Sequence, residues 1–252
     1  MSAVLDYKRK IYAIRELPTL PVIAQKVLSL ADDDEAGPKK LAAIISSDQA
    51  LAAKVLSLAN SAYYGHRAKI STIRQAVIVI GLNMLKQVSL SVLVCGMVGK
   101  RGRDRREFWK HSFGTATAAA LIAKRTGIYD GDICFMAGLL HDVGKVIIEN
   151  FFPEDSSISH TEVGSWMAER WQLPQALINA IAYHHSIEPA HLIQPTVASV
   201  HAANVCAKLA LSHEEVAIDP AVLKALRMSE PDFLAIVAEL QDSSPQIENL
   251  LM

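Results

Sequence analysis

The stretch CFMAGLLHDVGK, residues 134–145, places an ionisable pair, His141-Asp142, at the end of an apolar run. Burying such a pair costs free energy unless a metal ion or hydrogen-bonding partners compensate it. Neighbours on a helix point about 100° apart, so the imidazole and the carboxylate reach different sides of a shared cleft, and the carboxylate can bridge two ions. Lys145, one turn beyond His141, would present its ammonium to a phosphate oxygen. We therefore expect Asp142 and Lys145 to be catalytic residues.

Further metal-type side chains occur in order along the chain. Glu107 and His111 are four residues apart, so they share one face of a predicted helix. His160 begins a later helix, and the adjacent pair His184-His185 could serve two ions roughly 3.5–4 Å apart. The predicted ligands are Glu107, His111, His141, Asp142, His160, His184, His185 and Asn204.

Each of these residues also has a simpler interpretation when it is taken alone. A single histidine at a helix end, such as His160, is more often a cap or a surface residue, and Glu107 with His111 is typical of a solvated helix pair. We interpret His191, His201 and His213 as structural, although His201 lies three residues before Asn204 and could approach the cleft. Only the predicted ligands taken together, in their order along the chain, favour a metal site.

Asn204 stands where a hydrolytic centre would need a carboxylate. Its amide oxygen can coordinate a metal ion, but it brings no negative charge and cannot act as a strong base for the attacking water. We expect the centre to hold one to three divalent ions (Fe, Mn, Zn or Mg) and to hydrolyse poorly or not at all. Three hypotheses stay open: a signalling module that retains metal, an active metal-dependent phosphohydrolase, and a helical scaffold with a hydrogen-bonded histidine cluster.

Composition limits the remaining choices. The chain has 252 residues, is 51% apolar and carries a net charge of −1, so no global field attracts nucleic acid or acidic lipid. The basic segment 99–110 we interpret as a solvated linker, and we expect no nucleic-acid partner. Three cysteines without a CxxC pair indicate a reducing compartment. The amino-terminal residues lack the apolar core of a signal peptide, and no apolar run reaches the roughly 18 residues that span a bilayer. We expect a cytoplasmic protein that does not enter a membrane.

Apolar residues recur at helical spacing almost throughout, and no segment alternates as a strand would. The fold class is therefore predicted to be all-α. We place a boundary in the basic linker, which gives domains 1–102 and 103–252. Helices are predicted from Pro18 and Pro21 to the acidic residues 32–35, and at about 38–47, 48–58, 73–80 (capped by Ser71), 82–98, 106–127, 130–150, 159–171, 174–185, 195–212, 219–227 and 231–240.

The second half of the chain resembles the HD superfamily of metal-dependent phosphohydrolases. The resemblance rests on His111 in WKHS, on the pair in GLLHDVGK and on VHAANVCAKLA, residues 200–210, where Asn204 stands in place of the closing aspartate of the family. The additional Glu107, His160 and His184-His185 resemble the ligand set of the HD-GYP branch, which cleaves cyclic dinucleotides. The branch's Gly-Tyr-Pro segment is missing, because HHSIEPAHLIQP follows instead.

The first half resembles the HDOD family, the HD-related output domain of bacterial signalling proteins. The matching segments are LPTLPVIAQKVLSLADD, LAAIISSDQALAAKVLSLANSAYYG and ISTIRQAVIVIGLNMLKQVSL. This resemblance implies a helical regulatory module near two-component or cyclic-dinucleotide pathways. It further implies a signalling-protein partner, with a nucleotide as a possible ligand. The chain has no receiver, GGDEF or EAL segment, so we expect its input to arrive in trans.

Overall fold

The computed structural model describes residues 2–13, 37–60, 70–82, 105–153 and 158–249, together with the isolated positions 23, 26, 27, 85, 86, 89 and 92. Within these residues every regular element is a helix, which confirms the predicted all-α class. Contacts divide the chain into two compact units. One comprises Met1–Leu17 and Val98–Ser244, and the other Pro18–Met97 and Pro245–Met252. Residues 101–104 lie outside the described residues, so the boundary between 102 and 103 stays a prediction.

The Pro18–Met97 part of the second unit contains three described helices, whose apolar faces pack together. They are α3 Gly37–Ser46, α4 Gln49–Ala59 and α5 Ile73–Ile80. Asp48 begins α4 as predicted, since its Oδ1 accepts a hydrogen bond from Leu51 N at 2.9 Å. The predicted cap of α5 was wrong by one residue: Thr72 Oγ1 accepts from Gln75 N at 3.1 Å, whereas Ser71 Oγ bonds the Gln75 side chain. Most residues of the two helices predicted before residue 35 and at 82–98 lie outside the described residues.

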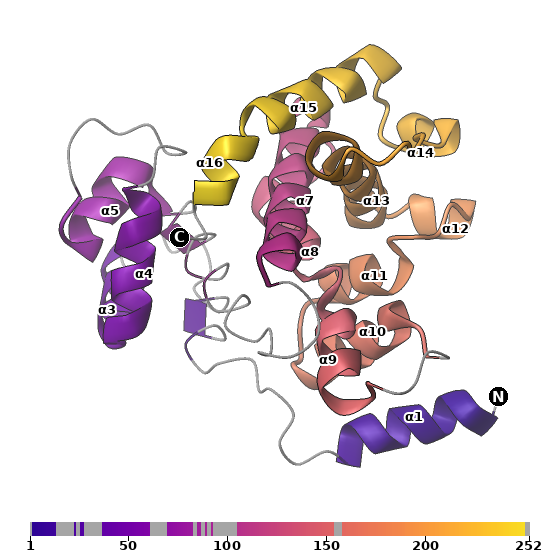
Figure 1. Cartoon of the computed structure of the whole chain (residues 1–252), viewed down its shortest axis with the longest axis horizontal. Helices are drawn as coiled ribbons and strands as arrows, with labels where there is room; N and C mark the ends of the chain where they lie inside the picture. Colours follow the sequence, from indigo (N-terminus) through magenta and orange to yellow (C-terminus); the bar gives the residue numbers. More distant parts are fainter. Residues whose placement is uncertain are drawn as a thin grey trace. The chain divides into compact units, whose positions relative to one another are not determined.

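The unit that carries the candidate ligands is a bundle of helices and contains most of the buried core (Figure 1). Its helices are α1 Ser2–Ala13, α7 Arg105–Thr126, α8 Gly131–Leu140, α9 Val143–Phe151, α10 His160–Arg170, α11 Gln175–Tyr183, α12 Pro189–Leu192, α13 Pro195–Ala207, α14 Pro220–Ala225 and α15 Glu230–Asp242. The short α16, Ser244–Asn249, follows in the chain and belongs, except for Ser244, to the other unit. In the described part of the chain, no helix combines the length and the apolar character that are needed to cross a bilayer.

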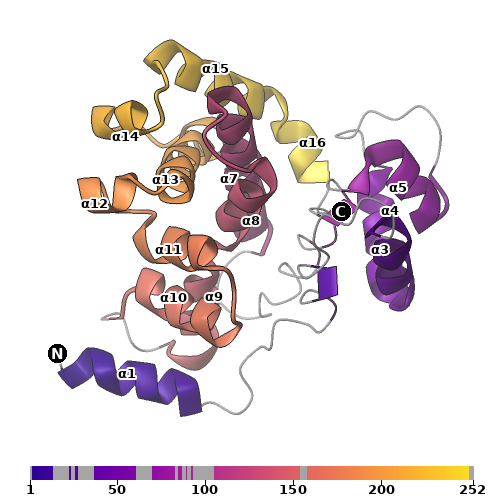
Figure 2. The same ribbon diagram turned by 180° about the vertical axis from the view of Figure 1, so that it is seen from behind.

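Helix α8 is buried along most of its length. Asp130 caps its start by accepting hydrogen bonds from the backbone N–H groups of residues 132 and 133, and the whole segment 134–140 is buried. Gly138 lets α8 lie directly against α7, because a Cβ at this position would stand 2.8 Å from Ala116 Cα. Figures 1 and 2 show α7 and α8 side by side, with α13 packed against both.

Two glycines set the crossing of α9 and α10. A Cβ on Gly144 would stand 1.9 Å from the His160 carbonyl oxygen and 2.7 Å from Gly164 N, and a Cβ on Gly164 would meet the Gly144 backbone at 3.2 Å. The backbones therefore touch where neither residue has a side chain. This contact brings the first residues of α9 and of α10 together, and with them Asp142 and His160.

Three local features differ from the predicted helices. The helix predicted over 130–150 is interrupted at His141 and Asp142, so α8 and α9 are separate helices. The helix predicted over 195–212 continues beyond Ala207 only as a π-helical turn, Lys208–Ser212, which ends at His213 with φ 53°. The amino-terminal α1, which was not predicted, packs on α10, where Lys8 and Tyr12 bond the Glu169 carboxylate.

Candidate metal centre

The His141-Asp142 pair forms the junction between α8 and α9. His141 ends α8 with φ −52° and ψ −36°, whereas Asp142 precedes α9 with φ −99° and ψ 9°. Aspartate at the start of a helix commonly accepts a hydrogen bond from the backbone N–H two or three residues later, but the Asp142 side chain makes no such bond. Its carboxylate is 97% buried and is available to the imidazoles around it.

Backbone carbonyls hold two of the histidines in one tautomer. His141 Nδ1 donates to Gly138 O at 2.7 Å, and His184 Nδ1 donates to Ile181 O at 2.9 Å. Both rings are fully buried. Because Nδ1 carries the proton, Nε2 of either ring presents a lone pair when that ring is neutral. Metal-binding histidines commonly have this arrangement, in which the second nitrogen is tied to a carbonyl.

The two oxygens of Asp142 face different histidines. Oδ2 lies 3.6 Å from His111 Nε2 and 3.3 Å from His141 Nε2. Oδ1 lies 3.3 Å from His160 Nε2 and 3.8 Å from His184 Nε2. In each set the ligand atoms all lie within 4.8 Å of one another. We call them the Oδ2 group, made of His111, His141 and Asp142, and the Oδ1 group, made of Asp142, His160, His184 and His185.

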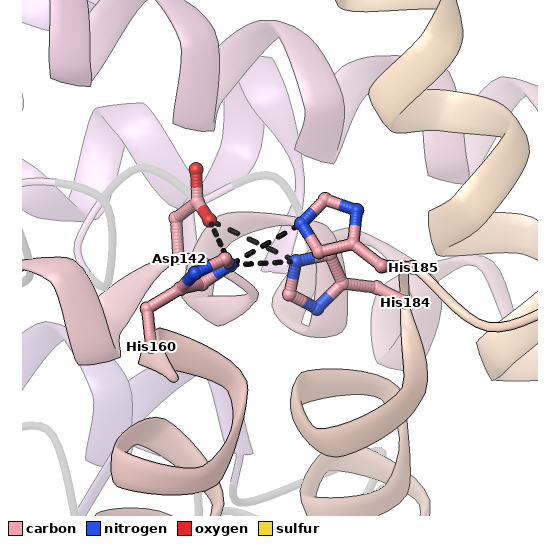
Figure 3. A group of neighbouring side chains, drawn as sticks. All are labelled: Asp142, His160, His184 and His185. Carbon is pink, nitrogen blue, oxygen red and sulfur yellow. Dashed lines mark hydrogen bonds and ion pairs between the residues drawn. The ribbon is translucent and has the colours of Figure 1, made fainter. Parts of the chain in front are cut away.

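The Oδ1 group is assembled from the ends of three helices (Figure 3). His160 is the first residue of α10, which Ser159 caps by accepting a hydrogen bond from Thr161 N, and the two adjacent histidines directly follow α11. His160 Nε2 lies 3.4 Å from His184 Nε2 and 3.2 Å from His185 Nε2. Three imidazole nitrogens therefore converge with one carboxylate oxygen.

Burial keeps histidines of the cluster neutral at pH 7. It is the largest cause that lowers the pKa of His111 to about 3. Burial likewise lowers the pKa of His160 and of His185 to about 4, although the Asp142 charge opposes the shift. It also holds the pKa of His184 well below its usual range. Neutral imidazoles are the form that binds metal ions.

Asp142 is ionised despite its burial. Burial by itself raises the pKa of this carboxyl group, but the attraction and hydrogen bonding of His141, followed by the attraction of Lys145, hold the pKa well below the usual range. Lys145 lies one turn into α9, and its Nζ donates to Asp142 Oδ2 at 2.5 Å. The ammonium therefore contacts the same oxygen that faces the Oδ2 group.

The other two predicted ligands occupy different settings. Glu107 lies one turn before His111 on α7, but its side chain is exposed and belongs to neither group. Asn204 lies on α13, a helix that packs against α7, α8 and α11. Its side chain is 5% exposed, and its Oδ1 makes no hydrogen bond with any described residue. A ligand role for Glu107 or Asn204 remains a prediction.

The sequence analysis missed one residue whose charge acts on the site. Lys208 directly follows α13 and contributes to the lowered pKa of both His111 and His185, after burial and larger charge effects. The available signal was its spacing, since Lys208 follows Asn204 by four residues and so shares its helix face. Burial lowers the pKa of His201, interpreted above as structural, and the His184 backbone opposes this shift.

The gathered side chains fit a divalent metal ion. Asp142 Oδ1 is buried and makes no hydrogen bond among the described residues, although it faces two imidazole nitrogens. Such an oxygen is costly to bury unless a cation or a donor satisfies it. Imidazole and carboxylate ligands suit zinc, iron and manganese. The donor set thus indicates a divalent ion without selecting among these metals.

Comparison with known proteins agrees with this description. The HDOD domain family matches residues 17–158, and the HD domain family matches residues 108–243. The crystal structure of an HDOD domain protein of unknown function from Geobacter sulfurreducens is 30% identical, covers 98% of this chain and 96% of its own, and superposes with a TM-score of 0.79.

Two curated relatives are longer than this chain. An uncharacterized protein of Treponema pallidum is 29% identical over 219 residues, which are 76% of this chain and 42% of that protein. Ribonuclease Y of Campylobacter jejuni is 30% identical over 174 residues, which are 69% of this chain and 30% of that protein. The chain therefore spans less than half the length of either relative.

Proposed function

This chain belongs to the HDOD domain family and contains an HD domain, and from this premise we propose that it is a signal-transduction output module with a degenerate phosphohydrolase centre. The centre binds a divalent metal ion but hydrolyses phosphate esters poorly or not at all. We further propose that it works in the cytoplasm and that its input comes from a signalling-protein partner in trans. The buried free thiols of Cys134 and Cys206 support a reducing compartment.

One observation carries the proposal: Asp142 supplies the single carboxylate of the two ligand groups. A bound divalent ion would supply Lewis acidity and a lowered pKa for a bound water. Two such ions need more negative charge than one carboxylate brings, and Asn204, at the family's aspartate position, has none to add. Its amide oxygen is also a poor acceptor for a proton from the attacking water. Lys145 can hold a phosphate oxygen but, as an ammonium, cannot take up a proton.

The test compares the unaltered chain with Asn204→Asp. Purified protein is incubated with Mn²⁺ or Fe²⁺ and with a panel of linear and cyclic nucleotides, and the release of product is measured. We expect no turnover by the unaltered chain and a gain on introducing the carboxylate. Asn150→Asp is the matched control, because the Asn150 side chain bonds the Val146 carbonyl within α9 and would bring the same charge outside the cluster.

An active phosphohydrolase is the second candidate. It is supported by the Oδ1 group, whose four ligands are sufficient for one ion, and by the ammonium of Lys145 beside it, which can bind a phosphate. A nucleotide or cyclic dinucleotide would then be the substrate. Robust, metal-dependent hydrolysis by the unaltered chain would establish this candidate and exclude the degenerate centre.

A further inference from the structure

The two carboxylate oxygens of Asp142 have different polar partners, and this difference predicts on which side an ion binds. We propose that one divalent ion is held by the Oδ1 group and that the ammonium of Lys145 occupies the place of a second ion on the Oδ2 side. The inference rests on the proposed function in that it requires metal binding. It adds that the ion binds on the Oδ1 side of the cluster and that the chain holds one ion.

The Oδ1 side has the more complete ligand set. It combines three imidazole nitrogens, from His160, His184 and His185, with a carboxylate oxygen. Four such donors complete the tetrahedral shell that zinc prefers. Oδ1 itself is buried and lacks a hydrogen-bond donor among the described residues. An ion at this position satisfies the oxygen and the lone pairs of the three rings at once.

On the Oδ2 side, the carboxylate already contacts a cation, the ammonium of Lys145. Lys145 Nζ lies 2.5 Å from Oδ2, within a strong charge-assisted hydrogen bond. Only two imidazoles, His111 and His141, accompany that oxygen, and Asn204 offers no additional charge. An incoming dication would have to displace or repel the ammonium while it gained only three ligands. Loading of this side is therefore weaker than loading of the Oδ1 side.

The arrangement assigns separate tasks to the halves of the cluster. Asp142 is shared, so its negative charge is divided between an ion on one oxygen and an ammonium on the other. Lys145 is then a positioning residue, because it fixes the carboxylate so that Oδ1 points to the three histidines. A chain with a carboxylate at 204 and no ammonium at 145 would instead hold two ions.

The experiment measures metal binding rather than activity. Protein made without a histidine tag is stripped with EDTA and titrated calorimetrically with Zn²⁺, and bound metal is counted by elemental analysis after desalting. We expect one ion per unaltered chain. His160→Gln should weaken binding by about 10–100-fold or more, the range of changes around a metal site. His111→Gln, the matched change on the other side, should alter the affinity by less than about threefold.

A second pair of variants tests the role of Lys145. Lys145→Met combined with Asn204→Asp should raise the stoichiometry to two ions, whereas Asn204→Asp alone, which keeps the ammonium, should bind the second ion only weakly. Circular dichroism of each apoprotein checks folding, and the stoichiometry of the unaltered chain tests the inference even if a variant fails to fold.

Several outcomes would overturn the inference. Loss of the ion in His111→Gln with retention in His160→Gln would place it on the wrong side, and two equal ions in the unaltered chain would refute the role given to Lys145. Both results leave a metal-binding module intact. A complete lack of metal binding would overturn the proposed metal centre as well, while hydrolysis by a chain with one ion at the Oδ1 group would overturn only the proposed inactivity.

Discussion

Substitution of Gly144 by alanine should both destabilise the bundle and open the metal centre. The added Cβ would stand 1.9 Å from the His160 carbonyl oxygen, 2.7 Å from Gly164 N and 2.8 Å from the His160 carbonyl carbon. All three atoms belong to backbone, so no rotamer change relieves the overlap. Ordinary contact begins at 3.4 Å, and α9 must therefore move away from α10 by about 1.5 Å, or the backbone must distort by a similar amount.

The size of the expected loss of stability follows from this displacement. Overpacking typically costs about 1–3 kcal/mol and occasionally more, and a clash with rigid backbone belongs at the upper end. A loss of about 3 kcal/mol lowers the thermal midpoint of a protein of this size by roughly 6–12 °C. Asp142 lies two residues before the glycine, so its 3.3 Å contact with His160 also opens. Metal sites tolerate only about 0.2 Å of change in ligand distances, and zinc affinity should fall with the midpoint.

Thermal unfolding followed by circular dichroism and calorimetric zinc titration measure the two effects. Gly131→Ala is the matched control, because a Cβ there has Ala120 O as its nearest neighbour, at 3.8 Å, and Gly131 begins α8. A glycine-to-alanine change in a compatible helical position stabilises by about 0.4–1 kcal/mol. If Gly144→Ala retained both the midpoint and the zinc affinity of the unaltered chain, the argument that this contact builds the centre would be wrong.

Three more predictions follow from the site and the core. Removal of a bound metal by EDTA should lower the thermal midpoint, because a ligand of the folded state stabilises by mass action; no shift in protein shown to contain metal beforehand would contradict this. Without metal, the pKa values of His160 and His185 in the folded protein are about 4, below the usual 6.5, so the unfolded chain binds more protons. The free energy of unfolding should therefore fall as pH drops from about 6.5 to about 4. Denaturant titrations that gave a constant midpoint over this range would refute this prediction. Burial raises the pKa of Cys134 to about 11 and of Cys206 to about 12. Iodoacetamide should therefore leave both thiols unmodified in the folded protein at pH 8. Rapid labelling detected by mass spectrometry would contradict this prediction, because it would show that the thiols are accessible.

The sequence predicts most of the helices because apolar spacing and local caps are local properties. Asp48, for example, caps α4 where the pattern begins. The errors have local causes as well. Ser71 and Thr72 are both good caps, and only the register of α5 chooses Thr72. The break at His141 and Asp142 leaves the apolar pattern uninterrupted, so periodicity alone extended one helix across it.

The candidate site was predictable in composition but not in arrangement. Order along the chain points to His111, His141 and Asp142 as neighbours, but it does not say which carboxylate oxygen faces which ring. That division depends on the crossing of α9 and α10 at Gly144, a tertiary contact without a periodic signal. Lys208 was missed for the same reason, since a lysine at the end of a helix usually indicates only a solvated cap.

The long spacing between the clustered histidines links metal binding to the folded state of the bundle. The contacts between rings join residues that are 30, 24 and 25 positions apart, and closing such loops in a disordered chain costs conformational entropy before any bond to an ion forms. Apart from the adjacent pair at 184 and 185, the unfolded polypeptide is therefore a poor chelator. An ion held by these rings would therefore bind the assembled bundle more tightly than the unfolded chain, so its loading would report a finished tertiary structure.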